Sequence, residues 1–370
     1  MIKYEIVIIG GGPAGLSAAI EAAEAGAGVL VIDENEKPGG QLFKQIHKFF
    51  GSKEHQAGTR GIDIGRQLLN ETKKSGIDVW LNSEVVGIAK DKTIWVIKDA
   101  AESLEVQAEK IIMSTGAIEN SLVFPGWNLP GVMTAGAAQT LINIHRVLPG
   151  ARVLMIGSGN VGVIVSYQLM QAGAEVVGII EAAPRLGGYG VHTAKVRRAG
   201  VPFYTSYTIK EAIGIGKVRG AIIVALDEKW QQIPGTEISF DIDTICVATG
   251  LTPLAELAWA LGCKFHYLPA MGGFIPDHDQ NMETNIKGIY VAGDIAGVEE
   301  ASTAMEEGRL AGVSAAASLA YLTEGESAKR YQEIWDRLNS LRSGPFGIKR
   351  RAAKELILQE EGRIIYDRSI

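Results

Sequence analysis

A strand–turn–helix pattern occurs twice in this chain, and its repetition constrains the fold more than any single motif. The first copy has an apolar strand at residues 3–9, a glycine turn at 10–15 and an alanine-rich run. The second has a strand at 152–156 and a turn at 157–162. In G-x-G-x-x-G turns, the first glycine makes the turn, the second admits a pyrophosphate and the third allows close helix packing. Both copies therefore predict a dinucleotide site at a helix start.

Each copy continues in the same way, which indicates an internal duplication. An acid ends the second strand of each copy: Asp33, with Glu34 beside it, and Glu181. Such an acid can accept hydrogen bonds from ribose hydroxyls. Short antiparallel strands follow, at 79–81, 84–89, 93–98 and 104–107 in the first copy and within 208–241 in the second. An apolar strand then ends each copy in a Thr-Gly pair, which allows close backbone approach.

A third glycine-containing turn follows the duplication. An apolar strand near residues 284–292 leads into Gly293-Asp294, and a helix of small residues begins near Ser302 and Thr303. One of these hydroxyl residues is expected as its N-cap. In the purely structural interpretation, Gly293-Asp294 forms a turn and a helix cap. The functional one is that Asp294 accepts a hydrogen bond from a sugar-like chain and the helix start faces an electron-rich group.

The segment from 42 to 60 is rich in basic and aromatic residues. It is either a solvated loop with an apolar underside or a loop beside a bound cofactor. In the second case Lys44 or His47 would face the reactive ring, and these are the two candidate catalytic residues. An amphipathic helix is expected over 62–75.

The C-terminal part, residues 326–370, is predicted to be a charged helical tail. Helices are expected over 328–341 and 348–360, separated by a break at 343–347. The cluster Lys349-Arg350-Arg351 is expected on a solvated helix face rather than in a binding patch.

Composition excludes several classes of function. A net charge of about −6 gives no general affinity for nucleic acid. The two cysteines, Cys246 and Cys263, lack C-x-x-C spacing, so no redox disulfide, iron–sulfur or metal site is expected. No apolar run is long enough to span a membrane, and no signal pattern precedes the first strand. We therefore expect a cytoplasmic protein.

Together these motifs resemble the flavoproteins with two dinucleotide-binding domains. The resemblance covers roughly residues 3–322. It implies an α/β fold of two Rossmann-like domains, the second inserted in the first, each with a small antiparallel meander. The FAD-binding domain would comprise 1–119 and 251–325, and the NAD(P)-binding domain 120–250. Asp33 would contact the adenosine ribose of FAD, with Glu34 as the alternative, Asp294 the ribityl chain, and Glu181 the ribose of the nicotinamide dinucleotide.

The candidate cofactor residues follow these motifs. In the first domain they are Gly10, Gly12, Pro13, Ala14, Gly15, Asp33, Glu34, Gly40, Gln41, Thr115, Gly116, Gly293, Asp294, Ser302 and Thr303. In the second domain they are Gly157, Gly159, Asn160, Val161, Gly162, Glu181 and Gly250. Glu181 should repel a 2′-phosphate, which favours NADH over NADPH, whereas the nearby Arg185 argues for the phosphate.

Residues 38–41 and the connector 124–139 resemble one branch of these proteins more closely. It comprises the FAD-binding α subunits of amine and amino-acid dehydrogenases, such as dye-linked proline dehydrogenase, opine oxidase and hydrogen cyanide synthase. Those subunits commonly carry a cysteine-rich iron–sulfur module towards the C-terminus, and the tail of this chain has no cysteine. Disulfide reductase activity is also unexpected, because that activity needs a redox C-x-x-C.

We therefore expect an FAD-dependent oxidoreductase that passes a hydride between NAD(P)H and flavin and acts on a further small molecule, as an oligomer. The alternative is an FAD-binding electron-transfer subunit that docks on a separate dehydrogenase through the tail. Its second site would hold another adenine nucleotide or nothing. A flavin-free NAD-binding protein would require Gly293-Asp294 to be only structural.

Overall fold

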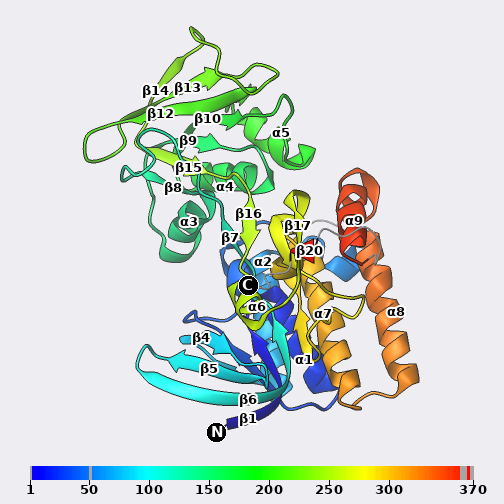
Figure 1. Cartoon of the computed structure of the whole chain (residues 1–370). Coiled ribbons are helices and arrows are strands. Elements are labelled where there is room, and N and C mark those ends of the chain that lie inside the picture. The colour runs from blue at the N-terminus through cyan, green and yellow to red at the C-terminus, as the bar shows by residue number, and fades with distance from the viewer. Residues whose placement is uncertain (1, 50–51, 359–364, 367–370) are drawn as a thin grey trace. The chain divides into compact units, whose positions relative to one another are not determined.

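A computed structural model of the chain describes residues 2–49, 52–358 and 365–366 (Figure 1). The chain divides into two compact units. The first combines the chain up to Ile118 with the chain from Thr252 onward, and the second is Glu119–Leu251. The C-terminal helices are grouped with the first unit rather than forming a unit of their own.

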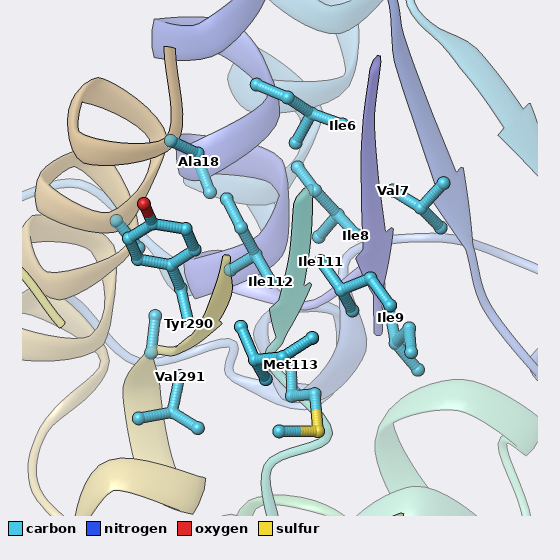
Figure 2. Close-up of a cluster of buried hydrophobic side chains, with 14 of the residues drawn as sticks. Ile6, Val7, Ile8, Ile9, Ala18, Ile111, Ile112, Met113, Tyr290 and Val291 are labelled. Atoms are coloured by element: carbon cyan, nitrogen blue, oxygen red, sulfur yellow. The ribbon is translucent and has the colours of Figure 1, made fainter. Parts of the chain in front are cut away.

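The first unit is built on a parallel sheet. β1 (Ile2–Ile9) is flanked on one side by β2 (Val29–Ile32) and β3 (Asp78–Trp80), and on the other by β6 (Glu102–Met113) and β19 (Ile289–Val291). Four consecutive residues of β1, from Ile6 to Ile9, are buried. Continuous burial of this kind is typical of parallel strands that are covered on both faces. Figure 2 shows the packing of these side chains around β6, β19 and Ala18 of α1 (Pro13–Glu24).

The meander of this unit differs from the expected one. The segments 104–107 and 110–113 form one strand, β6, which pairs antiparallel with β5 (Thr93–Lys98) and parallel with β1 and β19. Burial along β6 alternates around Val106 and becomes continuous from Ile111, so two patterns occur within one strand. β4 (Ser83–Ile88) pairs with β5 and completes the meander. β3, expected as a meander strand, instead extends the parallel sheet beside β2.

Two helices of the first unit approach each other closely through glycine. A Cβ on Gly308 of α7 (Ala301–Ser318) would lie 2.1 Å from the carbonyl oxygen of Ala14 in α1. A Cβ on Gly312 would lie 2.3 Å from the carbonyl oxygen of Ala18. The small residues of α7 therefore serve backbone-to-backbone packing on α1, the helix that follows the first glycine turn.

The tail helices begin earlier than expected. α8 (Glu324–Leu341) starts after Thr323, which forms a capping box with Glu326. α9 (Gly344–Leu358) starts within the segment predicted to separate the helices. Residues 359–360 of the second predicted helix lie outside the described residues. The other elements of this unit are η1 (Gly40–Lys44), η2 (Lys53–His55), α2 (Gly61–Lys74), α6 (Glu256–Leu261), β17 (Phe265–Leu268), η4 (Pro269–Met271), β18 (Gly273–Pro276), η5 (Gly293–Ala296) and β20 (Ile365–Tyr366).

The second unit repeats the parallel plan, which confirms the predicted α/β class. Its main sheet has the order β11 (Phe203–Thr205), β10 (Glu175–Glu181), β9 (Arg152–Ile156), β15 (Thr244–Val247) and β8 (Val132–Thr134). An antiparallel sheet of β12 (Tyr207–Ile213), β13 (Gly220–Ala225) and β14 (Ile238–Asp241) follows, as predicted. The remaining elements of this unit are α3 (Ala135–Thr140), η3 (Leu141–His145), α4 (Asn160–Gln171) and α5 (Gly190–Arg198). β7 (Ala117–Glu119) and β16 (Leu251–Pro253) include the two points at which the chain passes from one unit to the other.

Candidate functional site

The first glycine turn joins β1 to α1, and its three glycines have different reasons to be glycine. Gly10 has a φ of +103°, which side chains rarely adopt. A Cβ on Gly15 would lie 1.9 Å from the carbonyl oxygen of Gly10, so this position is closed by the fold itself. A Cβ on Gly12 would meet no protein atom within 4 Å. Only Gly12 therefore leaves backbone open to a ligand, as a pyrophosphate site requires.

The helix start behind this turn is able to receive an anion. Gly12 is the N-cap of α1 and makes no side-chain capping hydrogen bond, while Pro13 and Ala14 begin the helix. Amide groups in the first turn of a helix have no partner within the helix, and the helix dipole adds positive potential. Phosphate groups bind readily at such a position.

Asp33 at the end of β2 is tied to the same turn. Its Oδ2 accepts a hydrogen bond of 2.6 Å from the backbone N–H of Gly11, and its Oδ1 accepts one of 2.8 Å from Asn35. Asp33 is buried, with 4% of its surface exposed, whereas Glu34 is exposed. Of the two candidate acids, the structure thus places only Asp33 against the glycine turn.

A second loop lies against the turn. The amide of Gly39 donates to the carbonyl oxygen of Gly11 at 2.6 Å, and a Cβ on Gly40 would lie 3.0 Å from the Cα of Gly12. The neighbouring Gln41 is exposed. The Pro-Gly-Gly segment therefore borders the open face of Gly12.

The end of β6 completes this side of the site and includes a residue that the sequence did not single out. The Ser114 hydroxyl donates to the carbonyl oxygen of Gly10 at 2.8 Å. The next hydroxyl, on Thr115, donates to the carbonyl oxygen of Leu254 at 2.5 Å, which ties together the two chain segments of this unit. Gly116 has a φ of +78° and open space beside it. Ser114 was missed because a single serine that follows the end of a strand forms no sequence pattern of its own.

The turn that carries Asp294 lies beside the start of α1. Gly293 has a φ of +77°, and a Cβ there would lie 2.8 Å from the Cβ of Ala14. Asp294 accepts a long hydrogen bond, 3.4 Å, from the amide of Glu299. Burial, with the nearby Glu307 carboxylate and two further acids, raises the pKa of Asp294 to about 7. Its carboxyl group is therefore able to hold or release a proton near neutral pH.

The start of α7 lies a few residues after Asp294. Ser302 and Thr303 are both buried in its first turn. The expectation that one of them is the N-cap is wrong, because the N-cap is Glu300, without a side-chain capping hydrogen bond. Acids are favourable beside the positive end of the helix dipole, so Glu299 and Glu300 suit a helix that starts before Ser302. Amides of the first turn of α7 remain without side-chain caps, as they do in α1.

The two candidate catalytic residues lie in the loop between β2 and α2. Lys44 is the last residue of η1 and is partly buried. His47 is also partly buried, and its ring stacks on Phe49 with centroids 6.1 Å apart. Leu42 and Phe49 form the apolar underside with Ile64. Residues 50–51 of this loop lie outside the described residues.

The second glycine turn has the same construction as the first. Gly157 has a φ of +103°, and a Cβ on Gly162 would lie 2.2 Å from the carbonyl oxygen of Gly157. A Cβ on Gly159 would meet nothing within 4 Å. Asn160 and Val161 begin α4, and the Asn160 Oδ1 accepts from the amide of Tyr189 at 2.9 Å.

Glu181 occupies the position in this unit that corresponds to Asp33 in the first. Its Oε2 accepts from the amide and the hydroxyl of Ser158 at 3.1 and 2.6 Å, and its Oε1 accepts from the amide of Ala183 at 3.0 Å. Arg185 and Gly250 are exposed. The two turns present the same elements: an open middle glycine, a closed third glycine and an acid bound to the residue between the first two glycines.

These residues fit a dinucleotide at each turn, since the open faces of Gly12 and Gly159 lie at uncapped helix starts. The sequence model of the pyridine nucleotide-disulphide oxidoreductases matches residues 4–308. This chain belongs to that family. Membership of this family makes it an FAD/NAD(P)-dependent oxidoreductase.

Proteins similar in sequence to this chain include several that are named as enzyme subunits. An opine oxidase subunit of Agrobacterium tumefaciens (strain Ach5) is 31% identical over 85% of this chain, which covers 66% of that subunit. The corresponding opine oxidase subunit of Rhizobium meliloti (strain 1021) is 29% identical over 86% of this chain and 72% of its own length. Hydrogen cyanide synthase subunit HcnB of Pseudomonas aeruginosa is 29% identical over 97% of this chain and 81% of that subunit. The chain thus spans about two thirds of the opine oxidase subunits.

Solved structures share the fold. Thioredoxin reductase of T. acidophilum matches with a TM-score of 0.71 and 21% identity, over 86% of this chain and 100% of that one. L-proline dehydrogenase of P. horikoshii matches with a TM-score of 0.67 and 20% identity, over 90% of this chain and 59% of that one.

The chain departs from the disulfide chemistry in the family's name. Its two cysteines, Cys246 and Cys263, are both buried and are not joined in a disulfide. Burial raises their pKa values to about 12 and about 11, so neither is a reactive thiolate near neutral pH. Within the described ranges no three His, Cys, Asp or Glu residues form a metal-binding group. In the same ranges, no helix combines the length and apolarity needed to cross a bilayer.

Proposed function

We propose that the chain binds FAD at the first glycine turn and NADH at the second, and passes a hydride between the nicotinamide and the flavin. The observation that carries this proposal is the matched construction of the two turns around Gly12 and Gly159. FAD, when bound, supplies the capacity to accept a hydride and to release electrons to a second substrate. The protein supplies binding, orientation and electrostatics.

In the first unit, the residues of the turn would bind the phosphates. The open backbone at Gly12 admits the pyrophosphate, and the uncapped amides of α1 stabilise its charge. Asp33 holds the amide of Gly11 and retains acceptor capacity for ribose hydroxyls. Asp294 would bind the ribityl chain, and the start of α7 at Ser302 and Thr303 would stabilise negative charge.

In the second unit, Glu181 supports the choice of NADH. Its carboxylate faces Ser158 in the glycine turn and disfavours a 2′-phosphate through like-charge repulsion. Arg185 is exposed, so water and salt weaken the attraction that it offers to such a phosphate. Lys44 and His47 remain the proposed proton-carrying residues of the loop beside the first site.

To test this proposal, the purified chain is incubated with FAD, and unbound FAD is then removed. Visible absorbance measures bound flavin, and NADH or NADPH is then added without oxygen. The proposal expects about one FAD per chain and loss of flavin absorbance with NADH at lower concentration than with NADPH. Absence of bound flavin would contradict the proposed FAD site.

A second function is favoured by the relatives, several of which are named as subunits. Here the chain would be the FAD-binding subunit of a hetero-oligomeric amine or amino-acid dehydrogenase. Its second site would hold another adenine nucleotide or remain empty. In that case bound flavin would keep its absorbance on addition of NADH. It would lose absorbance only on addition of an amine substrate together with a partner dehydrogenase subunit.

A further inference from the structure

The C-terminal helices α8 and α9 contribute two buried cations to the first unit. They follow the region matched by the family, which ends at residue 308. The Arg342 side chain, just after α8, is 4% exposed, and that of Lys354 in α9 is 3% exposed. Lys and Arg are rarely this buried unless they are paired. The charged tail is therefore more than a solvated surface.

Both cations bind acids that lie just before α7 or in its second turn. Arg342 Nη2 lies 2.6 Å from Glu299 Oε1 and 2.6 Å from Glu307 Oε1. Lys354 Nζ lies 2.8 Å from the same oxygen of Glu307. The Glu299 and Glu307 side chains are 3% and 2% exposed. Two buried carboxylates are thus balanced by two buried cations, Arg342 just after α8 and Lys354 within α9.

The same cluster holds both ends of η5, the turn that carries Asp294. The other carboxylate oxygen of Glu307, Oε2, accepts from the backbone amide of Gly293 at 3.2 Å. Lys354 Nζ donates to the carbonyl oxygen of Ala296 at 2.5 Å. The first residue of η5 is therefore bound through Glu307, and the last is bound directly by Lys354.

Two further cations of the tail bind acids of α7 or its N-cap. Arg337 in α8 lies 2.9 Å from Glu306, which is also paired with Arg309. Arg350 in α9 lies 3.0 Å from the N-cap residue Glu300. These pairs are more exposed than those of Arg342 and Lys354, so we expect them to contribute less.

We propose that Lys354 and Arg342 are positioning residues for FAD, which hold η5 in the conformation that presents Asp294 to the cofactor. The inference rests on the proposed FAD site. The C-terminal helices contain none of the proposed cofactor contacts. They would nevertheless control how tightly the site binds FAD.

The test measures the FAD dissociation constant by quenching of flavin fluorescence, the visible circular dichroism of bound flavin and the Tm of the FAD-free chain. The principal variant is Lys354→Met, which keeps an unbranched side chain only one atom shorter and removes the charge and the hydrogen bonds. Lys354→Arg restores a cation. Arg351→Met is the matched control in the same helix, because Arg351 is exposed and pairs with Glu355 one turn away.

A double variant separates positioning from the burial of an unpaired charge. The double variant combines Lys354→Met with Glu307→Gln. Glu307 would lose Lys354 as a partner, but as Gln it no longer carries a buried charge, so much of the Tm lost in Lys354→Met should return. The bond from Lys354 to Ala296 is still absent. Positioning therefore predicts that Tm recovers while FAD binding stays weak and the flavin circular dichroism stays altered.

The proposal expects Lys354→Met to weaken FAD binding by about tenfold or more, as loss of a charged hydrogen bond implies. Lys354→Arg should recover most of this loss, and Arg351→Met should bind as the wild type does. Wild-type FAD affinity and flavin circular dichroism in Lys354→Met would overturn the inference and leave the FAD site intact. If Lys354→Met does not fold, the same result in the double variant would overturn it. A wild-type chain that binds no FAD instead overturns the proposed function.

Discussion

The Asp33 carboxylate accepts a hydrogen bond of 2.6 Å from the backbone amide of Gly11, which ties the end of β2 to the turn after β1. Glu181 binds the amide of Ser158 in the same way in the second unit. The proposed ribose-binding acids thus also shape the turns that would bind the phosphates. Substitutions at these positions test both roles, and neighbouring residues provide controls.

Asp33→Ala should impair both stability and FAD binding. The variant leaves the buried amide of Gly11 without an acceptor, which costs about 1–3 kcal/mol of unfolding free energy. FAD affinity should fall at least about tenfold as the turn loosens and the ribose contact is lost. Denaturant unfolding and fluorescence titration measure the two effects. Glu34→Ala, at the exposed neighbour, is the control, and equal effects at both positions would refute the role of Asp33.

Two glycines of the first turn should respond differently to alanine. Gly15→Ala places a Cβ 1.9 Å from a backbone oxygen, so we expect loss of folding or a drop in Tm of several degrees. Gly12→Ala meets no protein atom within 4 Å, and its φ of −77° suits alanine. This variant should fold with wild-type Tm as the FAD-free chain but bind FAD poorly. Normal FAD content in Gly12→Ala would show that the open face is not the phosphate site.

Glu181→Gln should reduce the preference for NADH. The amide oxygen of Gln can still accept from Ser158, while the negative charge facing a 2′-phosphate is removed. We expect the ratio of kcat/KM for NADH to that for NADPH to fall about tenfold, which corresponds to about 1.4 kcal/mol. Glu175→Gln, at the other end of β10, is the control. An unchanged ratio in Glu181→Gln would remove this carboxylate from coenzyme selection.

Asp294 should make the stability of the FAD-free chain depend on pH. Its pKa is raised from 3.8 to about 7 by burial and by Glu307, Glu299 and Glu300, while Arg342 and Lys354 balance two of these acids. The folded state therefore binds an extra proton between these pH values, and the unfolding free energy contributed by this group falls as pH rises from about 4 to about 7. Asp294→Asn should lack this decline.

The measurement is the Tm of wild type and Asp294→Asn at intervals across that range, without FAD. The difference in Tm should move in favour of the variant as pH rises. Parallel curves would mean that Asp294 titrates at its ordinary value and is not desolvated as the structure indicates.

Local sequence patterns were sufficient to predict the glycine turns with the strands and helices beside them, while the fold of two Rossmann-like domains came from the resemblance to a family. The spacing of Gly10, Gly12 and Gly15 and the apolar strand before them are both short-range signals. The spacing also predicted that the three glycines have different roles. The structure shows which backbone atoms lie close to Gly15 and that none lies close to the open face of Gly12. The single strand β6 was not predicted, because its burial pattern changes halfway along its length.

The charged tail shows why other features escaped prediction. A helix that mixes acids and bases has the same pattern whether its cations face water or a buried partner. Arg342 lies 35 residues from Glu307 in the sequence, and Lys354 binds a carbonyl oxygen 58 residues away. No periodicity links such positions. Their pairing depends on how α8 and α9 pack on α7, which only the folded unit determines.

The central claim is that one chain has an FAD site at Gly12 and a separate nicotinamide site at Gly159. Anaerobic titration of FAD-loaded Gly159→Ala with NADH, monitored by flavin absorbance, tests it most directly. A Cβ at this position meets no protein atom within 4 Å, so folding and FAD content should match the wild type. We predict that flavin absorbance persists at NADH concentrations that bleach the wild type. Bleaching at wild-type concentrations would contradict the claim.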